Sequence, residues 1–84
     1  IMDNFDKVKD ILSDVLGINE KKGSITAESS LLGGIPELDS MAVVNVVVAL
    51  TEHFDITVND DEINAKTFET LGSLVCFVEQ KLAE

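Results

Sequence analysis

Apolar residues recur with the period of an α-helix in three stretches of the chain. The first covers residues 4–16, where Asp3 is the expected N-cap and Gly17 the expected C-terminal stop. The second covers Asp39–Phe54, whose first residue is the expected N-cap, and the third follows Thr70, which can cap the last helix. The three stripes are Phe5, Val8, Leu12, Val15 and Leu16; Val43, Val46, Val47, Leu50 and Phe54; and Leu71, Leu74, Val75, Val78 and Leu82.

The segment between the first two stripes, residues 18–39, has no such period and is rich in Gly and Ser. This connection is unusually long for so small a protein. Scattered apolar residues predict that it is pinned across the core rather than disordered: Ile25, Leu31, Leu32, Ile35 and Leu38. Between the last two stripes, Asn59 is expected to cap a short helix near Asp60–Ala65, with Ile63 at the core or its rim.

These elements predict an all-α fold, a four-helix bundle of three long helices and one short one, with a long loop between helices 1 and 2. The valine run 46–48 would also suit a strand, but the apolar spacing over the whole stretch fits the helical period better. A chain of 84 residues builds a single core, so residues 2–84 are expected to form one domain. Ile1, which precedes Met2, is set aside as an expression remnant.

The net charge of the chain limits the classes of molecule that it is expected to bind. Sixteen acidic residues stand against six basic ones, a formal net charge of -10, which repels nucleic acids and anionic membranes and attracts proteins with basic patches. The single cysteine, Cys76, excludes an internal disulfide, and there is no signal-peptide pattern and no apolar run of about 20 residues. We therefore expect a cytoplasmic monomer that does not insert into membranes.

The second helix carries more apolar surface than one face can bury. Met41, Val44 and Val48 fall about 100 to 160° away from the core stripe, so they are expected to face water and to form a docking surface for other proteins. The alternative is that the long loop folds over them.

At the head of this helix stands Leu38-Asp39-Ser40-Met41, which places a hydroxyl where a helix N-terminus favours phosphate. Taken alone, an Asp-Ser pair is most often only a helix cap. The order of the elements, with Asp-Ser-Met opening an apolar helix, makes the chain resemble the acyl carrier protein family over everything after Ile1. The resemblance implies that a phosphopantetheinyl transferase attaches 4'-phosphopantetheine from coenzyme A to Ser40, and that the arm holds acyl groups as thioesters.

The same resemblance implies roles for further residues. Asp39 would help to position the transferase and its metal, and the recognition surface as a whole would comprise Asp39, Met41, Val44, Val48 and Glu52. The acyl chain would be sheltered by Val43, Val47, Leu50 and Ile63. The expected partners are acyl or AMP ligases, acyltransferases and synthases with basic docking patches. The chain itself would be no enzyme, since the thiol belongs to the prosthetic group.

Two departures from the family pattern bear on the pathway. Glu37 stands where carriers of fatty acid synthesis usually have Gly, and the second helix offers Ala42, Asn45 and Thr51 where they usually present acidic partner contacts. These departures favour a carrier dedicated to one pathway, similar to small carriers that accompany acyl-CoA-ligase-like enzymes in bacterial polysaccharide or specialised biosynthesis clusters.

Other interpretations stay open. Asp-Ser-Met also resembles D-alanyl carrier proteins, so the cargo could be aminoacyl, and an unmodified acidic adaptor could use the same apolar strip. A hydrolase or transferase is disfavoured, because His53 and Cys76 have no catalytic partner in sequence. The acidic run 60–62 lacks the ligand spacing of a calcium loop, so no metal site is expected.

Overall fold

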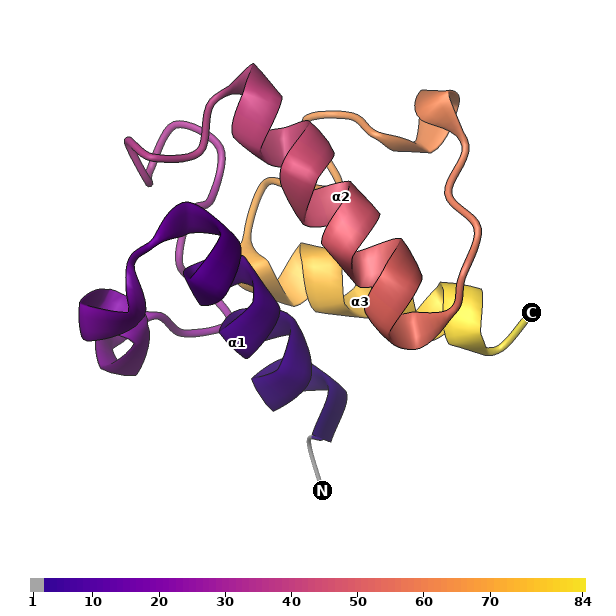
Figure 1. The fold of residues 1–84 in the computed structure, drawn as a ribbon, viewed down its shortest axis with the longest axis horizontal. Helices are drawn as coiled ribbons and strands as arrows, with labels where there is room; N and C mark the ends of the chain where they lie inside the picture. Colours follow the sequence, from indigo (N-terminus) through magenta and orange to yellow (C-terminus); the bar gives the residue numbers. More distant parts are fainter. Residues whose placement is uncertain (1–2) are drawn as a thin grey trace.

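The computed structural model describes residues 3–84 as three long helices packed around one core (Figure 1). These helices are α1 (Asp3–Leu16), α2 (Ser40–Phe54) and α3 (Leu71–Leu82). Two 3-10 turns, η1 (Asn19–Ser24) and η2 (Asp60–Glu62), lie in the connections, and α1 contacts both α2 and α3. The all-α prediction of three long helices, one short helix and a long first loop is confirmed, with η2 as the short helix.

The helix ends follow from local chemistry. The Asp39 side chain accepts a hydrogen bond from Ala42 N–H at 2.8 Å, which caps α2 as predicted. Thr70 and Ser73 exchange hydrogen bonds in a capping box at the start of α3. Gly17 ends α1 in the left-handed region at φ 69°, where a residue without Cβ is unstrained. The prediction that Asp3 precedes the first helix as its cap is wrong, because this residue already belongs to α1.

The core is built from the predicted stripes together with parts of the loops. Its buried members are Val8, Leu12, Ile18, Ile25, Leu31, Leu38, Val46, Leu50, Phe68, Leu71, Leu74, Val75 and Val78. Leu32 and Leu82, both expected inside, are 43% and 42% exposed. Leu32 opens a surface turn, and Leu82 lies in the last turn of α3 at the edge of the core, next to exposed Ala83.

The long connection is held against the start of α3 by backbone hydrogen bonds, which supply much of the pinning expected from its apolar residues. Leu31 N–H donates to Glu69 O at 3.0 Å, Leu71 N–H to Ser29 O at 3.1 Å and Gly72 N–H to Ala27 O at 2.8 Å. Figure 1 shows the connection passing close to the start of α3 before it turns back to α2. The head of α2 is therefore fixed relative to the rest of the core. The η1 turn within this connection was not expected from the sequence.

The short helix is shorter than expected. Asn59 directly precedes η2, and its N–H donates to Glu62 Oε1 at 2.9 Å, the contact by which the third residue of a helix binds the N-cap residue. The helical segment ends at Glu62 rather than Ala65. The reason is a competing turn, in which Asn64 Oδ1 accepts from Thr67 N–H at 3.0 Å.

Candidate functional site

Ser40 is the first residue of α2 and its side chain is exposed. The N–H groups of Ala42 and Val43 are bound by the side chain and the carbonyl of Asp39. The N–H groups of Ser40 and Met41 belong to the first turn, where a helix offers no intrahelical acceptor. These donors and the helix dipole favour a phosphate group on the Ser40 hydroxyl.

The segment before Ser40 is anchored from both sides. Leu38 is buried and its N–H donates to Ile35 O at 3.0 Å. On the solvent side, Lys21 Nζ lies 3.3 Å from Glu37 Oε2. The pKa of Glu37 is lowered, first by its own backbone N–H and then by Lys21. Glu37 thus holds the approach to Ser40 against η1.

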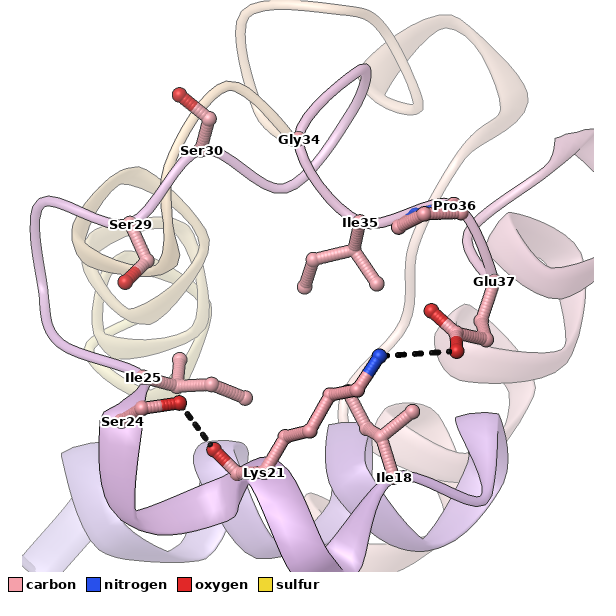
Figure 2. Close-up of a pocket in the computed structure, with 10 residues that line it drawn as sticks. All are labelled: Ile18, Lys21, Ser24, Ile25, Ser29, Ser30, Gly34, Ile35, Pro36 and Glu37. Carbon is pink, nitrogen blue, oxygen red and sulfur yellow. Dashed lines mark hydrogen bonds and ion pairs between the residues drawn. The ribbon is translucent and has the colours of Figure 1, made fainter.

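This ion pair lies at the rim of a hollow in the long connection. Figure 2 shows Ile35 pointing into the hollow, with Lys21 reaching across its edge to Glu37. The volume is about 320 Å³, and the base includes Ile18 and Ile25, both buried. Ser40 is not among its lining residues, so this hollow is separate from the candidate attachment site.

A second hollow begins at Ser40 itself. This groove of about 350 Å³ runs between α2 and the segment that follows η2. Its lining is mostly apolar: Leu32, Ser40, Val43, Val44, Ile63, Asn64, Ala65 and Phe68. A group attached to Ser40 therefore enters an apolar groove directly.

The four predicted acyl-lining residues are divided between two places. Val43 and Ile63 line the groove that contains Ser40. Val47 and Leu50 line an interior void of about 10 Å³, and Ile63 borders this void as well. A space of this size is at the lower limit for a single water molecule. The protein's own side chains therefore fill the interior, and no room is left there for an acyl chain.

Four groove residues were missed by the sequence reasoning: Leu32, Asn64, Ala65 and Phe68. They lie in irregular segments, where no periodicity indicates which side chains face α2. The one available signal was the closeness of Asn64 and Ala65 to Ile63, which the sequence had already suggested as a lining residue.

The predicted strip on α2 is exposed. Met41, Val44 and Val48 are 71%, 52% and 49% exposed, so the long loop does not cover them. Glu52, one turn further along α2, is exposed and borders a shallow hollow between α1 and α2. Apart from Asp39, which caps the helix, the predicted recognition residues thus extend along the open side of α2.

The other reactive side chains have ordinary surroundings. His53 is exposed and meets the Phe54 ring edge-on, with a centroid distance of 5.0 Å. Cys76 is exposed, and its sulfur accepts from Gln80 Nε2 at 3.7 Å. Among the side chains that the structure describes, those of residues 4–59 and 61–84, no group of three His, Cys, Asp or Glu is placed to hold a metal ion. Over the same residues, no helix has the length and apolar character needed to cross a membrane.

Known proteins resemble this chain along nearly its whole length. Residues 6–78 match the protein family described as "Phosphopantetheine attachment site". The acyl carrier protein of Clostridium acetobutylicum is 36% identical over 95% of this chain and 97% of that protein. The chain belongs to the acyl carrier protein family. The acyl carrier protein of Clostridium perfringens is 33% identical over 90% of this chain and 93% of its own length.

A solved structure extends the similarity to three dimensions. The solution structure of a holo acyl carrier protein from Nitrosomonas europaea is 61% identical, with a TM-score of 0.90 over 99% of this chain and 100% of that one. As an acyl carrier protein, the chain carries acyl groups on phosphopantetheine and is a non-catalytic carrier. The head of α2 fits this group, because an exposed hydroxyl, first-turn N–H donors and an adjoining groove meet there. Phosphopantetheine supplies the thiol that forms the thioester.

Proposed function

We propose that Ser40 is the residue of this acyl carrier protein that bears the 4'-phosphopantetheine arm. The observation that carries the proposal is that the exposed Ser40 hydroxyl lies at the head of α2 and opens on an apolar groove. The helix end favours the phosphodiester, and the anchoring of Leu38 keeps the hydroxyl in a fixed position for the transferase.

The test is intact-protein mass spectrometry after incubation with coenzyme A, magnesium and a broad-specificity phosphopantetheinyl transferase. We expect one phosphopantetheine increment in the natural sequence and in Ser30→Ala, and none in Ser40→Ala. Ser30 is a matched control, because it is another exposed serine and lies in the connection that leads to α2. An increment that persists in Ser40→Ala would overturn the assignment, and a chain that takes up no arm at all would favour the adaptor role.

The same proposal extends to the surface that partner enzymes contact. We assign this surface to Asp39, Met41, Val44, Val48 and Glu52. The three apolar members, Met41, Val44 and Val48, are each about half exposed or more. Among residues 3–84 the other large exposed apolar side chains are Leu32 and Leu82. The net charge of -10 supports partners with basic patches, whose approach it accelerates.

For the cargo, we propose a carrier dedicated to one pathway, loaded by an acyl or AMP ligase and unloaded by an acyltransferase or synthase. Two positions that depart from the pattern of fatty-acid-synthesis carriers support this proposal. Glu37 pairs with Lys21, so this departure has a structural partner in the chain. Asn45 gives the exposed surface of α2 a neutral group where those carriers usually present an acidic one. The acyl chain would then contact Val43 and Ile63 first and reach Val47 and Leu50 only if Ile63 moves.

Loading assays decide the cargo. The holo protein is incubated with ATP and a panel of ligases specific for fatty acids, short or branched acids and amino acids, and the thioester is read by intact mass. We expect acyl loading by ligases outside general fatty acid synthesis. Efficient use by the enzymes of fatty acid synthesis would contradict the dedicated role, and aminoacyl loading alone would replace the acyl cargo by an aminoacyl one.

A further inference from the structure

The hollow in the long connection, or loop hollow, has an apolar base and a rim of polar side chains (Figure 2). Ile18 and Ile25 are buried at its base, and half-buried Ile35 points into the space. Its volume of about 320 Å³ is far larger than the void of about 10 Å³ inside the core. The loop hollow therefore offers apolar surface that the packing of residues 4–59 and 61–84 leaves uncovered.

The polar groups on the rim are already bound to one another or to nearby backbone. Lys21 Nζ lies 3.3 Å from Glu37 Oε2. Ser24 Oγ donates to Lys21 O at 2.8 Å, and Ser29 Oγ accepts from Thr26 N–H at 2.8 Å. An ionic ligand would have to separate the ion pair, whereas an apolar group can enter without breaking these contacts. The rim therefore favours an apolar occupant.

The loop hollow lies close enough to Ser40 to be covered by the same partner. Glu37, on its rim, precedes Ser40 by three positions, which is at most about 11 Å of extended chain. A protein–protein interface covers about 800 Å² on each partner, a patch roughly 30 Å across. The whole molecule measures 32 × 30 × 20 Å. An interface centred on Ser40 extends roughly 15 Å to each side, so it includes Glu37.

We propose that the loop hollow receives a large aliphatic side chain of the ligase that loads the cargo, as a second contact beside the apolar strip on α2. Apolar side chains that fill a pocket on the partner supply much of the binding energy of an interface. The inference rests on the proposed function, namely on attachment at Ser40 and on a dedicated loading ligase.

The choice of the ligase follows from Glu37. This residue stands where carriers of fatty acid synthesis usually have Gly, and glycine has no side chain to pair with Lys21. The rim of the loop hollow thus depends on a residue by which this chain departs from those carriers. A surface that distinguishes one carrier from others suits an enzyme that serves this carrier, rather than a transferase of broad specificity.

The first test measures loading of the holo protein by the ligase of the panel that loads it best. Ile35→Ala removes apolar surface that points into the loop hollow, and Ser24→Leu extends an apolar side chain from its rim. We expect each variant to lower the kcat/KM for loading about tenfold through a higher KM for the carrier, because docking precedes the chemical step. Modification by the broad-specificity transferase should stay unchanged.

Ile56→Ala is the matched control for Ile35→Ala. Ile56 is another half-buried isoleucine in a connection, but it lies after α2 and does not line the loop hollow. We expect this variant to be loaded at the natural rate, and urea unfolding shows how much stability each variant loses. Equal loading defects in Ile35→Ala and Ile56→Ala would trace the loss to stability and overturn the docking contact.

The second test detects the occupant by NMR of the holo protein with labelled isoleucine methyl groups. The ligase is added without ATP, so that it binds the carrier but does not load it. The methyl signals of Ile18, Ile25 and Ile35 should shift or broaden more than the signal of Ile56. The acid that the ligase uses, added without the ligase, should leave all four signals unchanged.

The outcomes separate this inference from the proposed function. Slower loading of Ile35→Ala and Ser24→Leu, together with methyl shifts in the loop hollow, supports it. Natural loading rates in both variants, or methyl shifts only outside the loop hollow, overturn it while attachment at Ser40 stands. Shifts caused by the acid alone would make the loop hollow a small-molecule site and also overturn it. If no ligase loads the holo protein, the dedicated role fails and the inference fails with it.

Discussion

Lys81 Nζ lies 2.7 Å from Glu62 Oε1, and this ion pair ties η2 to α3. The Lys81 side chain is only 8% exposed, and the same Glu62 oxygen accepts from Asn59 N–H. The Asn59 N–H first and Lys81 second lower the pKa of Glu62, and the hydrogen bond to Glu62 raises the pKa of Lys81. Because Glu62 also borders the interior void, the pair holds the η2 segment over the core.

This pair predicts a pH-dependent loss of stability. Since the folded-state pKa of Glu62 is below its unfolded value, its contribution is present above the unfolded carboxyl pKa and disappears as pH falls through the folded pKa. Lys81 stays charged throughout this range, because its pKa is raised. We expect Glu62→Gln to lower the free energy of unfolding at pH 7 and to make little difference in strong acid.

The measurement is urea unfolding of the natural sequence and Glu62→Gln at a series of pH values from 7 downward. Glu79→Gln is the control, because Glu79 is an exposed acid on α3 and should show a much smaller change. A difference between the natural sequence and Glu62→Gln that stays constant with pH would contradict the assigned role of the pair.

Asp39 has a capping role that can be separated from recognition by partners. Asp39→Ala removes the acceptor for Ala42 N–H and should cost about 1 kcal/mol of stability, whereas asparagine caps about as well as aspartate. We expect Asp39→Asn to unfold at nearly the natural urea concentration and still to be modified more slowly by the transferase. Equal modification rates for Asp39→Asn and the natural sequence would limit Asp39 to capping.

Ser13 is fully buried in α1, and no hydrogen bond of its hydroxyl is found within the described residues 3–84. Burying an unpaired hydroxyl is unfavourable, and alanine is also the better helix former. We expect Ser13→Ala to raise stability by about 1 kcal/mol, or roughly 4–8 °C in Tm for a domain of this size. Calorimetry checks the shift.

Ser73→Ala is the contrasting variant. Ser73 Oγ accepts from Thr70 N–H and donates to Thr67 O at 2.9 Å, so its removal should lower Tm. Changes of the same sign in Ser13→Ala and Ser73→Ala would show that the hydrogen bonding of the hydroxyl does not decide the effect.

The exposed strip on α2 predicts an effect on partners without an effect on folding. Val44→Ser should lower the kcat/KM of the phosphopantetheinyl transferase about tenfold if Val44 is a central apolar contact. Leu82→Ser changes an exposed apolar residue of α3 and should leave this rate unchanged. Equal losses in the two variants, or no loss in Val44→Ser, would remove Val44 from the recognition surface.

The helices of this protein can be predicted from the sequence, because their bounds and their apolar faces depend on residues close together in the chain. Asp39 and Thr70 cap the helices that follow them because a side-chain oxygen reaches a backbone N–H three residues away. The exposure of Met41 and Val44 also follows from the helical period, since a helix in so small a domain buries only one face. The order of the elements, with Asp39-Ser40-Met41 opening an apolar helix, indicates the family from the sequence alone.

The groove beside Ser40 is formed by segments that are far apart in the sequence. Leu32 and Asn64 reach it from irregular stretches whose paths are set by backbone hydrogen bonds, such as Leu32 N–H to Phe68 O at 3.0 Å. No periodicity governs such segments, so Leu32 was expected inside, and η2 was expected to continue beyond Glu62. Local spacing thus determined the helices and the candidate attachment serine, whereas the surface against which an arm can rest exists only where the loops pack against α2.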